Sequence, residues 1–140
     1  MKSLLAPALA ILVTLPLLAT AAELTINPGL WETKITRTNP MTGSATTNTN
    51  TECVKEETTF NPRSMLAQAK DCRVMKDDLD GDTLNFQMKC NVQGATTEVT
   101  GMYQAGNDSG KGNMEMKMNM GGMSMSMNMN WTAKRLGDCS

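Results

Sequence analysis

The sequence of 140 residues contains no histidine. This absence excludes catalytic triads and dyads built on an imidazole, zinc sites with histidine ligands, and a histidine pH switch. An excess of charge of one sign is also missing, because 13 Lys and Arg residues stand against 14 Asp and Glu residues, for a net charge of −1. A chain without excess positive charge has little with which to neutralise phosphates, so we expect no nucleic acid partner.

Large apolar residues other than methionine are scarce as well. From residue 23 onward the sequence has 17 Val, Ile, Leu, Phe, Trp and Tyr residues, against 13 methionines. So few conventional core residues are typical of disordered chains, but those chains also carry a large net charge, which this one does not. We therefore expect a folded domain in which methionine forms a major part of the core.

The one long apolar run lies at the N-terminus, from Leu4 to Leu18, and follows Lys2. Small residues come next and offer a cleavage site after Ala21 or Ala22. This three-part layout is typical of a secretory signal peptide, and the run is too short and too interrupted for a membrane span; a retained anchor is the alternative. We predict a cleaved signal peptide over residues 1–22, a periplasmic or secreted location, and no membrane span in the mature form.

Four cysteines, an even number, predict two disulfide bonds in a small exported domain. No Cys-x-x-Cys motif is present, so structural bonds are favoured over redox catalysis or a zinc site. A predicted hairpin centred on Gly81 places Cys72 opposite Cys90 and Val74 opposite Met88. This slightly favours the pairs Cys72–Cys90 and Cys53–Cys139. The alternative joins neighbours in sequence, Cys53 with Cys72 and Cys90 with Cys139.

Short segments in which apolar and polar residues alternate recur along the chain, with Gly, Asn and Pro between them. They predict strands over residues 30–38, 44–54, 72–78, 83–90, 98–104, 113–120 and 123–130. The segment Asn61-Pro62-Arg63-Ser64, followed by residues 65–70, predicts one short helix. The expected fold is mainly β, a single antiparallel meander of about six to eight strands over residues 23–140, able to curl into an incomplete barrel.

An acidic cluster around Gly81 has the composition of a calcium-binding loop: Asp77, Asp78, Asp80 and Asp82. Aligning Gly81 with the glycine of such a loop puts Lys76 at the first ligand position and Gln87 at the position that requires a carboxylate. The cluster is therefore interpreted as a solvated hairpin turn.

The most regular segment is a methionine-rich tract near the C-terminus. Methionine alternates with polar residues over 113–120 and again over 123–130, on either side of Gly121-Gly122. A two-residue turn at these glycines pairs Met114 with Met129 and places all eight methionines of the tract on one face. Trp131 continues that face.

Motifs at both ends of the expected domain resemble a family of exported bacterial proteins, domain of unknown function 3617. They are Pro28-Gly29-Leu30-Trp31-Glu32, the single cysteines in the middle, the Met-x-Met strands, and Arg135-Leu136-Gly137-Asp138-Cys139. The resemblance implies a small periplasmic or secreted domain rich in antiparallel strands, and it implies no activity. The hairpin is richer in methionine than is typical of that family.

We expect no enzyme activity, because no nucleophile has a partner base and the carboxylates lie in turns. The first hypothesis is a non-enzymatic binding or structural module for an envelope partner or a small apolar ligand. The alternative is binding of Cu(I) or Ag(I), since thioether sulfur is a soft ligand; a third is an oxidant sink. No other cofactor is expected. The metal ligands would lie at the open end of the hairpin, next to Trp131: Met114, Met116, Met127 and Met129.

Overall fold

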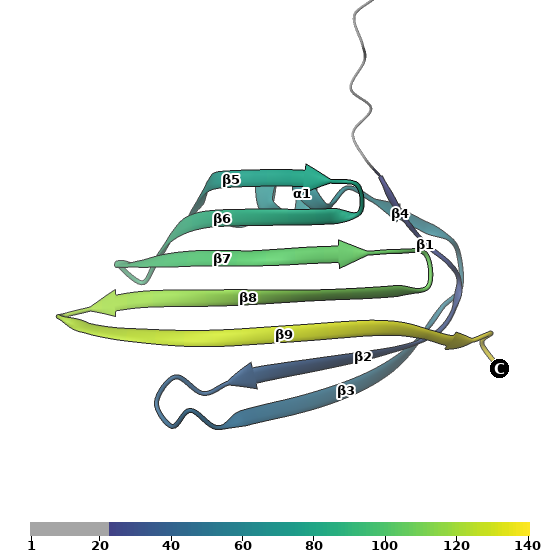
Figure 1. The fold of residues 1–140 in the computed structure, drawn as a ribbon, viewed down its shortest axis with the longest axis horizontal. Helices are drawn as coiled ribbons and strands as arrows, with labels where there is room; N and C mark the ends of the chain where they lie inside the picture. Colours follow the sequence, from purple (N-terminus) through teal and green to yellow (C-terminus); the bar gives the residue numbers. More distant parts are fainter. Residues whose placement is uncertain (1–22) are drawn as a thin grey trace, which may run out of the picture.

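The computed structural model describes residues 23–140, so the predicted signal peptide lies outside the described residues. The chain forms a curved seven-stranded antiparallel sheet in the order β3-β2-β9-β8-β7-β6-β5 (Figure 1). Its strands are β2 (Gly29–Thr38), β3 (Ala45–Val54), β5 (Cys72–Asp80), β6 (Thr83–Val92), β7 (Ala95–Ala105), β8 (Ser109–Met120) and β9 (Met123–Gly137). The mainly-β prediction is confirmed. The sheet is not closed into a barrel, and β3 and β5 form its two edges.

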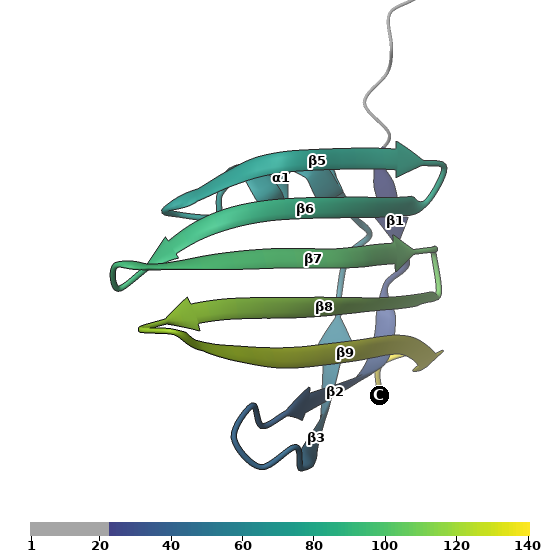
Figure 2. The ribbon, with the colours of Figure 1, turned by 60° about the vertical axis from the view of Figure 1, so that its left-hand side comes forward.

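Three short elements lie on one side of this sheet (Figures 1 and 2). They are β1 (Leu24–Ile26) with its antiparallel partner β4 (Thr58–Phe60), and the helix α1 (Pro62–Ala67). The helix begins at Pro62, within the predicted segment, because Asn61 caps it: the Asn61 side chain accepts a hydrogen bond from the Arg63 amide at 2.9 Å. It ends at Ala67, three residues before the end of that segment. Within residues 23–140, no helix is long and apolar enough to cross a membrane.

The methionine-rich tract is the β8–β9 hairpin, with the predicted register. Met120 pairs with Met123, Met118 with Met125, Met116 with Met127, and Met114 with Met129. Side chains alternate between the two faces of a strand, so all eight methionines share one face and the polar residues share the other. The one-faced methionine hairpin is therefore confirmed.

The β5–β6 hairpin has the predicted pairing at its open end, but its turn and the pairing near the turn differ from the prediction. Cys72 lies opposite Cys90 and Val74 opposite Met88, as expected. The turn is nevertheless only two residues long, and a bulge between Val74 and Lys76 shifts the pairing by one residue. Because a bulge changes which residues face the core, Leu79 joins Cys72 and Val74 on the apolar face.

The main core lies between α1 and the apolar face of β5 to β8. Its buried members are Leu66, Leu84, Met88, Cys90 and Val99. Met114 and Met116 are half-buried and pack against this cluster. Methionine thus forms part of the core, as the shortage of other large apolar residues predicts.

Two disulfides link distant parts of the chain. One joins Cys72 to Cys90, across the β5–β6 ladder and beside the core. The other joins Cys53, on the edge strand β3, to Cys139, just beyond β9. This is the pairing that the sequence slightly favours, and residues 23–140 contain no free cysteine.

Candidate functional site

A hollow of about 190 Å³ opens on the apolar face of the sheet, between α1 and the base of the methionine hairpin; we call it the α1 hollow. The helix contributes Pro62, Met65 and Leu66 to its lining. Side chains of the sheet complete it, among them Leu84, Tyr103, Met114, Met129 and Trp131. Pro62, Leu66 and Leu84 are buried, so the wall next to the core is held in place by packing.

A second hollow of about 170 Å³ lies further along the same face, and we call it the β1 hollow. Its lining includes Ile26 of β1, Trp31 and Thr33 of β2, and Ala133 of β9. Tyr103 and Trp131 line both hollows. The two spaces together reach the lower end of the range of about 300–1,000 Å³ that is usual for small-molecule sites.

Tyr103 and Trp131 stand between the hollows and contact each other, with ring centroids 5.0 Å apart and an interplanar angle of 40°. Burial raises the pKa of Tyr103 from 10.0 to about 12. Because the folded state holds the phenol proton more tightly, the stabilising effect of this shift is present below pH 10 and is lost as the pH rises through about 12. At physiological pH the wall between the hollows therefore carries no charge.

Trp131 occupies its place because its neighbour on β8 is a glycine. Gly112 lies directly opposite Trp131, and a β-carbon at position 112 would overlap the indole ring and crowd the carbonyl of Met102. We expect Gly112→Ala to displace the indole and to lower the free energy of unfolding by about 1–3 kcal/mol, the usual cost of overpacking. Urea unfolding measures this change.

Gly106→Ala is the matched control for that substitution. A β-carbon at position 106 would meet only the carbonyl of Ser109, at 3.7 Å, which is ordinary contact. We expect this variant to unfold within about 0.5 kcal/mol of the unaltered protein. Equal stability of the two variants would show that Gly112 does not make room for Trp131.

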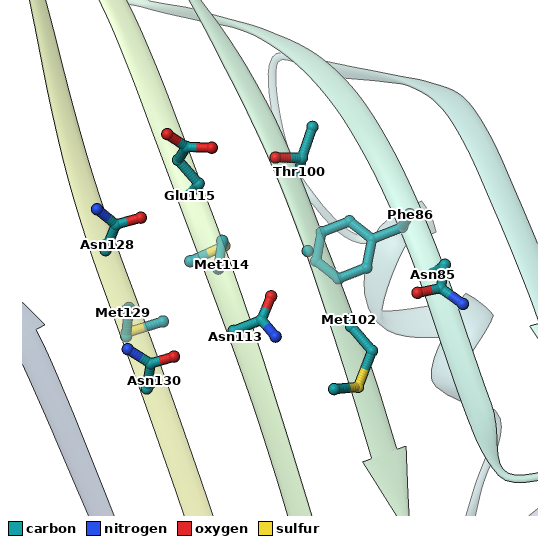
Figure 3. Close-up of a pocket in the computed structure, with 11 residues that line it drawn as sticks. Asn85, Phe86, Thr100, Met102, Asn113, Met114, Glu115, Asn128, Met129 and Asn130 are labelled. Atoms are coloured by element: carbon teal, nitrogen blue, oxygen red, sulfur yellow. The ribbon is translucent and has the colours of Figure 1, made fainter.

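A larger hollow of about 560 Å³ lies on the opposite, polar face of the sheet. Figure 3 shows Asn113 and Glu115 of β8, Asn128 and Asn130 of β9, and Met102 of β7 around it. The three asparagines are exposed, so a polar ligand would have to replace hydrogen bonds that these amides can make with water. The apolar face offers the more favourable site, because burial there removes apolar surface from water.

The four methionines that the sequence suggests as metal ligands lie together at the base of the hairpin, in the predicted cross-strand pairs. All four are half-buried: Met114, Met116, Met127 and Met129. Met114 and Met116 pack against the core, and Met114 and Met129 line the α1 hollow next to Trp131. These side chains therefore already have apolar neighbours.

The acidic cluster at the β5–β6 turn has structural partners. Thr83 and Gln104 donate hydrogen bonds to Asp82 at 2.9 and 3.2 Å, and these bonds lower the pKa of Asp82. Asp77 pairs with Arg63 of α1 at 3.2 Å. Within residues 23–140, no three Asp, Glu, Cys or His residues are grouped in a way that could hold a metal ion.

A family model described as a protein of unknown function (DUF3617) matches residues 26–139. The chain belongs to the DUF3617 family. No curated protein and no solved structure gives a significant match. Membership agrees with the resemblance carried by the two end motifs, and it supplies no activity for this DUF3617 domain.

The two end motifs of the DUF3617 domain meet in space. Arg135 donates a hydrogen bond to the carbonyl of Pro28 at 2.6 Å and contacts Asp138 at 2.5 Å. Gly29 has a φ of 145°, and a β-carbon there would overlap Arg135 and the carbonyl of Gly137. Glycine is required at this close approach of two backbones. The two motifs therefore hold the start of β2 against the end of β9.

Sequence reasoning missed most residues of the apolar hollows, because they come from eight elements that are spread along the chain. One signal was available. Gly110 and Gly112 alternate on β8 ahead of the methionines and lie opposite Ala133 and Trp131 once the hairpin register is extended. A glycine opposite a tryptophan, with a second glycine two residues away on the same face, indicates space for the indole ring.

Proposed function

We propose that this DUF3617 domain is a non-enzymatic binding module that holds a small apolar ligand, such as an acyl chain, on the apolar face of its sheet. The observation that carries the proposal is the pair of adjoining hollows that share Tyr103 and Trp131. A ligand lying across both would bury apolar surface against largely preformed walls, which is the usual basis of small-molecule binding.

The hairpin methionines suit this role. Met114 and Met129 of the hairpin line the α1 hollow together with Met65 of α1. Methionine has three rotatable bonds and a polarisable sulfur, so such a wall can adapt to ligands of different shape. The absence of histidine and the uncharged wall at Tyr103 support binding rather than catalysis.

We further propose that the protein acts outside the cytoplasm. The two disulfides support an oxidising compartment, where such bonds form and persist. The N-terminal apolar run of the sequence supports export. In the cell envelope or outside it, the candidate ligands are lipids, their free acyl chains and other apolar small molecules.

The experiment uses N-phenyl-1-naphthylamine, an uncharged dye whose fluorescence rises in apolar surroundings. We expect the protein to enhance its fluorescence and decanoic acid to displace it. Met65→Glu places a carboxylate at the α1 hollow, and because burying an unpaired charge is costly, we expect it to weaken dye binding by at least about tenfold.

Met75→Glu is the matched control. Met65 and Met75 are 53% and 49% exposed, so both substitutions change the surface to a similar degree, but Met75 lies at the β5 bulge, away from both apolar hollows. We expect this variant to bind the dye as the unaltered protein does. No fluorescence enhancement by the unaltered protein, or equal affinity of the two variants, would refute the proposal.

A further inference from the structure

The tip of the methionine hairpin differs from its base in exposure. Met120 and Met123 flank the Gly121-Gly122 turn and are 45% and 69% exposed. The next pair, Met118 and Met125, is half-buried. None of the four packs against the main core under α1, and none lines the α1 or the β1 hollow. Four thioethers thus share one face at a place where core packing does not require them.

We propose that these four methionines, Met118, Met120, Met123 and Met125, bind one soft monovalent cation, Cu(I) or Ag(I). Thioether sulfur is an uncharged, soft donor that suits Cu(I) and has little affinity for Ca²⁺ or Mg²⁺. The site differs from the set at the base of the hairpin, where Met114 and Met116 are engaged by the core.

The register brings the four side chains within reach of a single ion. Met118 lies opposite Met125, and Met120 opposite Met123. Directly opposed residues have β-carbons about 4.5–5.5 Å apart, and residues two apart along a strand are separated by about 7 Å. Methionine side chains are long and flexible enough for four sulfurs at the corners of such a rectangle to converge above its centre.

The chain offers this ion few competing soft ligands. The sequence has no histidine. Cys53, Cys72, Cys90 and Cys139 are all in disulfides. Charged side chains near the tip lie on the other face of the hairpin, where Lys117 pairs with Glu115 at 3.5 Å. Arg37 shares the methionine face, but it lies opposite Met129 at the base of the hairpin and not beside the four methionines of the tip. No charged residue between positions 113 and 130 shares the face of those four methionines.

The test measures Cu(I) transfer from the chromogenic chelator bicinchoninate in the absence of oxygen. It compares three proteins, each with both disulfides formed. One is the unaltered chain. The tip variant carries leucine at positions 118, 120, 123 and 125, and the base variant carries leucine at 114, 116, 127 and 129. Leucine keeps the volume and apolar character of methionine, so both variants should fold, as circular dichroism will check.

We expect the unaltered protein to take up one Cu(I), the tip variant to lose at least about tenfold in affinity, and the base variant to keep it. No uptake by the unaltered protein, or full uptake by the tip variant, would overturn the proposal. Loss confined to the base variant would also overturn it and would favour Met114, Met116, Met127 and Met129 instead.

A second readout does not depend on any variant. The methyl signals of Met118, Met120, Met123 and Met125 should shift together when Ag(I) is added to the unaltered protein, and shifts elsewhere alone would contradict the site. The tip variant should still bind N-phenyl-1-naphthylamine. Failure of the metal site and failure of the apolar site are therefore separate results.

Discussion

Replacing Cys53 and Cys139 together by valine is expected to lower the free energy of unfolding by about 4–5 kcal/mol. The bond joins residues 86 positions apart, and closing a loop of that length removes a large amount of entropy from the unfolded chain. Cys53 is exposed and Cys139 half-buried, so little core packing changes with it. Urea unfolding of the oxidised proteins, followed by circular dichroism, measures the loss.

The matched control replaces Cys72 and Cys90 by valine. Their bond spans only 18 positions, so the same model predicts a smaller loss of about 3 kcal/mol. Valine keeps an apolar side chain at buried Cys90. A Cys53–Cys139 variant as stable as the Cys72–Cys90 variant would show that loop closure does not dominate the contribution of these bonds.

Leu84→Ala is expected to cost about 2–5 kcal/mol, the usual range for removing a buried leucine side chain. Leu84 is 1% exposed and lies in the main core, where it also lines the α1 hollow. The alanine variant should unfold at a lower urea concentration. Its affinity for the dye should also change, because the removed atoms enlarge the α1 hollow. Urea unfolding and dye titration on the same sample measure both effects.

Leu136→Ala is the control, since Leu136 is 52% exposed on β9. We expect its free energy of unfolding to stay within about 0.5 kcal/mol of the unaltered value. If Leu84→Ala were as harmless as Leu136→Ala, the core under α1 would not hold the domain together.

The methionine hairpin could be predicted in detail because its register follows from residues that are close together in the sequence. A strict alternation on both sides of Gly121-Gly122 leaves one register that puts all eight methionines on the same face. The β5–β6 hairpin shows the limit of such reasoning. A turn centred on Gly81 would contain three residues, but the observed turn between Asp80 and Thr83 contains two. The bulge near Met75 compensates for the missing residue, so that Cys72 still pairs with Cys90. No local sequence pattern indicates the bulge. Its effect is to place the Leu79 side chain on the apolar face, where it packs against the core.

The candidate site was much less predictable. Met65 of α1, Tyr103 of β7 and Trp131 of β9 come from segments far apart in the sequence and meet through the curvature of the sheet and the placement of the helix. The sequence indicated an apolar face but not the position of α1, which decides which methionines are covered. For the same reason it favoured metal ligands at the base of the hairpin rather than at its more exposed tip.

The most direct test of the apolar site is to follow the methionine methyl signals by nuclear magnetic resonance, with carbon-13 in the methyl groups, while decanoic acid is added. Four methionines line the α1 hollow: Met65, Met102, Met114 and Met129. We predict that their signals shift with a common, saturable dependence on decanoic acid, while exposed Met41 and Met75 stay unchanged. Unchanged signals from the hollow, or shifts confined to Met41 and Met75, would contradict binding on the apolar face.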